Sequence, residues 1–212
     1  MYVFGLGPFD VPMVYHMIEE ILIVAIFVTI GIIASRIYTK KHSVRLWYFT
    51  LAFYVFAIDS TIHTLAHLFQ YHQIIWFSLI LRFLAYIVIL VGITIREDNL
   101  HLIKRFCLIV IVLSFLFAFP LFHNMLPVFE HDRFVMWIPA AVFALLIATV
   151  YFYNHTKTHS RFALWMGIAF AVIAAANVIL AVPSYIGDLI WIIGHIVRLF
   201  GVSLIPVALR VP

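Results

Sequence analysis

Seven long apolar runs constrain this chain more than any other feature of its sequence. A helix that crosses the hydrocarbon core of a membrane needs about 20 apolar residues, and each of the runs is about that long. Of the 212 residues, 66% are hydrophobic and only 10% are charged, whereas soluble domains have about 25% charged residues. The runs span roughly residues 14–36, 46–70, 73–95, 104–126, 134–153, 162–183 and 188–209.

The connections between these runs are short and leave no room for a soluble domain. The sequence therefore predicts an all-α, polytopic protein of the cell membrane, in which residues 1–212 form a single domain with a bundle of seven transmembrane helices.

The basic residues predict the orientation of these helices. Lys and Arg concentrate on the cytoplasmic side of membrane proteins, and ten of them fall at one set of run ends, whereas only Arg133 falls at the other. We therefore expect the N-terminus outside the cell and the C-terminus in the cytoplasm. The net charge of +4 follows from this asymmetry and gives no reason to expect a nucleic-acid partner. The ten residues are Arg36, Lys40, Lys41, Arg45, Arg96, Lys104, Arg105, Lys157, Arg161 and Arg210.

The ionisable residues inside the runs gather in one half of the predicted membrane. When the runs are threaded back and forth, these residues fall in the outer leaflet or near the middle, and five of the eleven histidines are among them. A charged side chain that faces lipid costs a few kcal/mol, so the clustering predicts a site inside the bundle. The residues are His16, Glu19, Glu20, Asp59, His63, His67, Arg82, His123, His195 and Arg198.

Helical spacing predicts which of these side chains share a face. Asp59, His63 and His67 follow one another at intervals of four residues, and each interval of four brings side chains onto one stripe of a helix. His16 and Glu20 have the same spacing. We expect both stripes to face the bundle interior.

We further expect His63 and His195 to face each other, with His16 and Glu20 within reach. Glu19 is expected to extend to the membrane interface instead.

Some of the same residues also have a structural interpretation. Asp59, Arg82 and Arg198 lie at similar predicted depth and are expected to form an ion pair that locks helices together. The tryptophans near the run ends are expected in the interfacial belts, where amphipathic rings collect; they are Trp47, Trp76, Trp137 and Trp191.

The clustered histidines predict a bound cofactor. Haem b is the first candidate, with His16, His63 and His195 as its binding residues and Arg82 and Arg198 beside the propionates. A zinc, copper or iron ion is the second candidate, because imidazole and carboxylate groups form a compact ligand set. The third candidate is a polar network that binds a small ligand or a proton. The residues of the metal alternative are His63, His67, His123, His195, Glu20 and Asp59.

These cofactors favour two functions. The first is sensing of a ligand or of redox state, or electron transfer, by a group bound near the outer face. The alternative is a zinc-dependent membrane hydrolase with its site on Asp59, His63, His67 and His195. The sequence leaves open whether the protein is an enzyme.

Four segments together resemble a known family. They are His16 with Glu20 before an apolar run, Asp59-Ser-Thr-Ile-His63-Thr-Leu in the second run, Arg82 in the third, and Gly194-His195-Ile-Val-Arg198 in the last. Over nearly its whole length the chain is similar to the MASE-type membrane-associated sensor domains, in particular to the class with Asp-x-x-x-His-Thr-Leu and Gly-His-x-x-basic motifs.

The resemblance implies a sensor of seven or eight helices that is normally joined to a cytoplasmic kinase or cyclase domain. Since the sequence ends at Pro212, directly after the last run, we expect a separate cytoplasmic signalling partner or a redox partner. A homo-oligomer is left open. His67 and His123 are not part of the resemblance.

The charge bias gives a topology that can be tested by cysteine labelling. After the single native cysteine, Cys107, is replaced by serine, a cysteine at position 41 or 105 should not react with a membrane-impermeant thiol reagent added outside the cell. A cysteine at position 131 should react. Reaction at position 41 without reaction at position 131 would reverse the predicted orientation.

Overall fold

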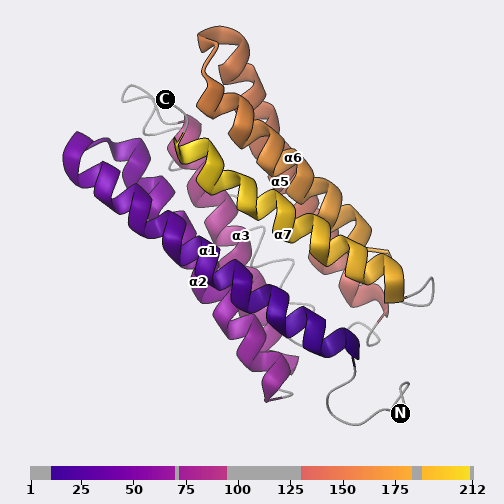
Figure 1. The fold of residues 1–212 in the computed structure, drawn as a ribbon. Coiled ribbons are helices and arrows are strands. Elements are labelled where there is room, and N and C mark those ends of the chain that lie inside the picture. The colour runs from indigo at the N-terminus through magenta and orange to yellow at the C-terminus, as the bar shows by residue number, and fades with distance from the viewer. Residues whose placement is uncertain (1–10, 70–71, 95–129, 183–187, 211–212) are drawn as a thin grey trace.

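The computed structural model describes residues 11–69, 72–94, 130–182 and 188–210, and long α-helices make up these ranges (Figure 1). All six described helices contain a segment long and apolar enough to cross a membrane. The predicted run 104–126 lies outside the described residues, so the seventh span stays a prediction. The helices are α1 (Val11–Lys41), α2 (Val44–Leu68), α3 (His72–Thr94), α5 (Glu130–Thr158), α6 (Arg161–Leu180) and α7 (Asp188–Arg210).

Two helices extend well beyond the apolar runs that predicted them. Run 14–36 becomes α1, which continues to Lys41, and run 134–153 becomes α5, which continues to Thr158. The last turns carry Lys40, Lys41 and Lys157. A basic side chain near a helix C-terminus interacts favourably with the partial negative charge there. The helices therefore continue into the polar interface, where hydrophobicity no longer marks them.

The described helices form two units of three, α1–α3 and α5–α7. Within each unit, each helix packs against the next one in sequence, and the units meet through two smaller seams, α1 with α7 and α3 with α5. Figure 1 shows that both units run in the same direction, because α1, α3, α5 and α7 all end at the same end of the bundle. The chain thus leaves α3 at one end and enters α5 at the other.

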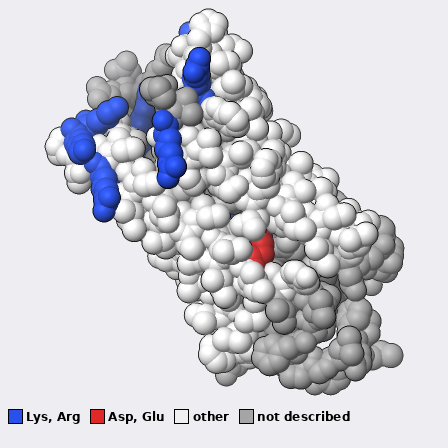
Figure 2. All heavy atoms as spheres, viewed as in Figure 1, with Lys and Arg blue, Asp and Glu red and all other residues white. Residues whose placement is uncertain are grey.

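Basic side chains gather at the end of the bundle where α1 joins α2 and α5 joins α6 (Figure 2). The prediction that the basic residues of successive loops lie on one side agrees with this arrangement. Which side of the membrane this end faces remains a prediction from the charge bias.

The core consists of small residues at helix contacts and aromatic residues at the centre. Ala52, Ala144 and Ala169 are fully buried, and small side chains let membrane helices approach closely. Phe53 and Phe170 are buried in the same apolar cluster, one from each unit. A cluster of buried polar residues lies beside this apolar core where the two units meet.

Candidate functional site

Polar side chains collect between the two units, and each is at most 6% exposed. They come from α1, α2, α3, α6 and α7. Because no water competes in the interior of a membrane bundle, such groups must pair with one another or with a ligand. The residues are His16, Glu19, Glu20, Asp59, Ser60, His63, Ser78, Arg82, Asn177, His195 and Arg198.

Arg198 on α7 joins the two units by binding both glutamates of α1. Its Nε donates to Glu19 Oε1 at 2.8 Å, and its Nη2 donates to Glu19 Oε2 at 2.7 Å and also to Glu20 Oε1. Two parallel bonds between a guanidinium and a carboxylate fix both distance and orientation. The α1–α7 seam is therefore held in one register.

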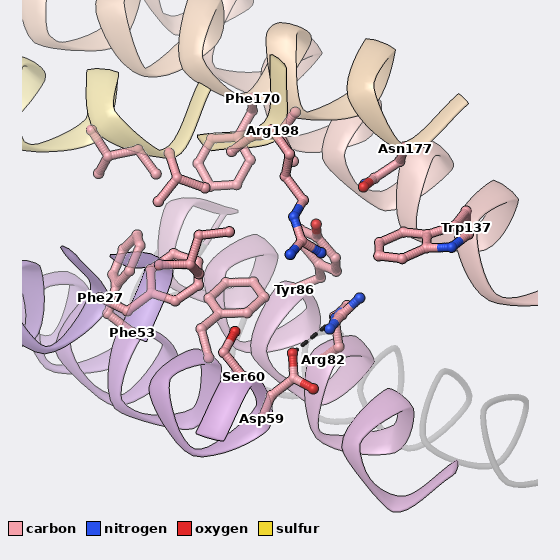
Figure 3. A pocket seen from close by; sticks show the side chains of 15 residues that line it. Phe27, Phe53, Asp59, Ser60, Arg82, Tyr86, Trp137, Phe170, Asn177 and Arg198 are labelled. Atoms are coloured by element: carbon pink, nitrogen blue, oxygen red, sulfur yellow. Dashed lines mark hydrogen bonds and ion pairs between the residues drawn. The ribbon is translucent and has the colours of Figure 1, made fainter. Parts of the chain in front are cut away.

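A second ion pair lies within the first unit. Arg82 Nε on α3 donates to Asp59 Oδ2 on α2 at 2.8 Å (Figure 3), and the Ser78 hydroxyl donates to Asp59 Oδ1 at 2.6 Å. The same hydroxyl lies 3.4 Å from Nδ1 of His63. Both oxygens of the Asp59 carboxylate are thus engaged.

Trp137 on α5 contacts both arginines. Its ring centroid is 5.1 Å from Cζ of Arg82 and 5.2 Å from Cζ of Arg198, within the range of cation–π interaction. The side chain is only 5% exposed. The expectation that Trp137 belongs to an interfacial belt is therefore wrong. Because α5 begins at Glu130, four residues before the predicted run, the ring lies deeper in the helix than the run suggests.

His16 is the centre of the histidine group. Its ring centroid lies 5.3 Å from that of His63 and 4.6 Å from that of His195. Trp191 packs against two of these rings, at 5.3 Å from His16 and 4.2 Å from His195. Of the two predicted stripes, Asp59 with His63 and His16 with Glu20 are buried, whereas the side chain of His67 lies outside the described residues. His16, expected only within reach of the other two imidazoles, lies beside both of them.

The glutamates of α1 complete this group. Nδ1 of His195 lies 3.0 Å from Glu19 Oε2, and Nδ1 of His16 lies 3.8 Å from the same oxygen. Glu19 was expected at the membrane interface, but it is buried. The guanidinium of Arg198 and the nearby imidazoles stabilise its carboxylate inside the bundle, which is the physical reason for the difference.

Among the described residues, two sets of three potential metal ligands share His16. One is His16, Glu19 and His195, and the other is His16, Glu20 and His63; in each, the ligand atoms lie within 4.8 Å of one another. Zinc binds imidazole and carboxylate at about 2.0–2.2 Å, so small side-chain movements bring three such atoms to one ion. Imidazole ligands also suit iron and copper.

A cavity beside the cluster, lined by Asp59, Arg82, Trp137, Asn177 and Arg198 at its polar end (Figure 3), has a volume of about 30 Å³. That space holds a water or two, whereas small-molecule sites measure about 300–1,000 Å³. The three-ligand sets of the described residues could hold a single metal ion, and haem b stays a prediction.

Other predicted site residues are placed differently or lie outside this description. Asp59 was expected to pair with both arginines, but it binds Arg82 alone, because the two glutamates occupy Arg198. His67 belongs to α2, but its side chain is outside the described residues, as is the whole of His123.

Loss of the Arg198 guanidinium should strongly destabilise the bundle. In the R198M variant, Glu19 and Glu20 remain buried without their cation, and breaking a buried ion pair in this way costs about 3–5 kcal/mol. Thermal unfolding in detergent should show a large fall in Tm for R198M and little change for R210M, since Arg210 is exposed on the same helix. Adding E19Q and E20Q to R198M should recover part of the loss. Equal Tm values for R198M and R210M would contradict the structural role of this pair.

Comparison with known families identifies the chain. The family model of MASE3, a membrane-associated sensor domain, matches residues 9–211. The comparison with curated proteins found no match, and neither did the comparison with solved structures. The matched range includes all six described helices and every residue of the polar cluster, so the resemblance to MASE-type sensor domains is confirmed. The chain belongs to the MASE3 family of membrane-associated sensor domains.

Proposed function

We propose that this sensor domain detects a divalent transition-metal ion, bound by His16 together with neighbouring glutamate and histidine side chains. One observation carries the proposal. Glu20 is fully buried, and among the described residues its Oε2 atom has no hydrogen-bond partner. An unpaired carboxylate oxygen is costly in a low-dielectric interior. A cation bound to Oε2 removes this cost, and the His16–Glu20–His63 set supplies its other ligands.

The charge of the cluster also favours a cation. Its buried carboxylates are Glu19, Glu20 and Asp59, and its buried guanidiniums are Arg82 and Arg198. With neutral histidines, one negative charge remains. Electrostatic attraction in a membrane interior is strong, so the cluster attracts a positive ion and repels an anion.

The proposed signal is the occupancy of this site. Under the predicted orientation the ion binds in the outer half of the membrane, and the bundle carries the change to the basic end. A cytoplasmic signalling partner then reads it there. This assignment is a proposal from the cluster's position and from the sensor family.

The hydrolase alternative has less support. It requires Asp59 beside the histidines on one zinc ion, but Arg82 and Ser78 hold both oxygens of that carboxylate. Neither of the three-ligand sets found in the described part of the chain includes Asp59. Redox sensing and electron transfer depend on a redox-active group such as haem, which a visible absorption spectrum detects.

Ion binding should depend on the shared ligand. Calorimetric titration of the detergent-purified protein with Zn²⁺ should give one ion per chain. The H16A variant should bind more weakly by a larger factor than the roughly 10- to 100-fold caused by loss of an outer-shell partner. H155A is the matched control, because His155 lies at the basic end, with Nδ1 2.9 Å from the Ser160 carbonyl oxygen.

Two further variants decide between the ligand sets. A larger loss in H63A than in H195A assigns the ion to Glu20, and the reverse assigns it to Glu19. Unchanged Zn²⁺ binding in H16A overturns the proposal. A visible absorption spectrum with a Soret band, in protein purified without added metal, also overturns it and supports haem b.

A further inference from the structure

The two three-helix units share a sequence motif at the same structural position. Residues 39–43 (Thr-Lys-Lys-His-Ser) connect α1 to α2, and residues 156–160 (Thr-Lys-Thr-His-Ser) connect α5 to α6. His42 and His159 both adopt left-handed backbone conformations, with φ of 47° and 51°. Each of their amides donates to the carbonyl four residues earlier at 2.7 Å. Left-handed φ is uncommon outside glycine, so two matching occurrences in one motif indicate a repeat.

The correspondence continues into the helices. In α2, residues 52–57 read Ala-Phe-Tyr-Val-Phe-Ala, and in α6, residues 169–174 read Ala-Phe-Ala-Val-Ile-Ala. Phe53 and Phe170, which are equivalent in this alignment, both line the central cavity. Arg82 and Arg198 are each the eleventh residue of their helix.

The packing follows the same symmetry. The α1–α7 seam corresponds to the α5–α3 seam when the units are exchanged, and these are the two seams through which the units meet. Both units run in the same direction (Figure 1). A pseudo-two-fold axis along the bundle would produce this pairing of seams between two parallel units. Few positions outside the motif are identical, so the repeat is hard to recognise from the amino-acid sequence alone.

The two halves differ in their chemistry. When residues 39–43 are aligned with 156–160, Glu20 and His63 correspond to Trp137 and Leu180. Counted from the starts of α3 and α7, Leu79 corresponds to His195. Ionisable ligands therefore occur at one seam, and aromatic and apolar residues replace them at the other. On the face shown in Figure 2, acidic atoms come to the surface of the described part between α1 and α7.

We propose that the two units are tandem repeats that move against each other as rigid bodies, and that ion binding beside the α1–α7 seam drives the movement. The inference rests on the proposed metal site. Arg198 holds the units together by binding Glu19 and Glu20. A divalent ion on either carboxylate places like charge beside the guanidinium and weakens this contact. The α3–α5 seam, where Arg82 contacts Trp137, binds no ion and acts as the pivot.

The movement has a direct route to the basic end. Both five-residue motifs and the ends of α3 and α7 lie there (Figure 1). In secondary transporters built from internal repeats, substrates bind at the repeat interface and the repeats rock around the site. A change at the seam therefore becomes a displacement of one unit's end relative to the other, which a partner at that end detects.

Distances between spin labels at the basic end test this inference. Labels are attached to cysteines introduced in protein whose Cys107 is replaced by serine. One pair, at Lys40 and Lys157, joins the units; the control pairs, Lys40 with Thr94 and Lys157 with Arg210, each lie within one unit. All four positions are exposed. Zn²⁺ should shift the distance between the units by about 2 Å or more and leave both control distances unchanged.

Two variants separate this inference from the proposed function. H16A should abolish the Zn²⁺-dependent shift. E19Q weakens the Arg198 contact without an ion, so metal-free E19Q should show the shift between units while the control pairs confirm intact units.

If calorimetry detects Zn²⁺ binding but the distance between the units does not change, the proposed movement is wrong and the proposed metal site is still supported. Absence of Zn²⁺ binding overturns the metal site, and E19Q then decides the movement alone. A change in the control distances shows that the units are not rigid bodies.

Discussion

The paired glutamates around the Arg198 guanidinium are the interaction on which the bundle interior depends. Each of these charges would be costly in lipid, and together they stabilise one another only while α1 and α7 stay in register. Trp137 shields the same guanidinium from the α5 side. The ion pair therefore sets how the two three-helix units meet, and the histidines are positioned by the helices that it holds.

This arrangement suits a sensor because the buried positive and negative charges of the cluster nearly cancel. Three carboxylates face two guanidiniums, and Glu20 Oε2 has no hydrogen-bond partner among the described residues. A fully satisfied network would be rigid and indifferent to a ligand. A network with one unsatisfied anionic oxygen gains stability when a cation arrives, and the differential affinity between two arrangements is what shifts a conformational equilibrium.

The repeat explains why the site lies to one side of the bundle. Two units with the same topology provide a symmetric frame, with Arg82 and Arg198 at equivalent places. At the α1–α7 seam Arg198 pairs with the glutamates of the other unit, whereas at the α3–α5 seam Arg82 packs against Trp137 and pairs with Asp59 of its own unit. A symmetric frame with a single asymmetric site can convert the occupancy of that site into a displacement between halves.

The sequence by itself determined the helical, membrane-spanning class, the gathering of basic residues at one end and the burial of the polar cluster. It also identified the sensor family, because the short motifs that contain Asp59, His63, His195 and Arg198 can be recognised within the apolar runs. Only the tertiary structure decided which charges pair, that Glu19 is buried, that His16 lies between the other imidazoles and that Trp137 contacts both arginines. Helical periodicity shows which residues share a face. It does not fix the rotation of one helix against another, and that rotation selects each partner.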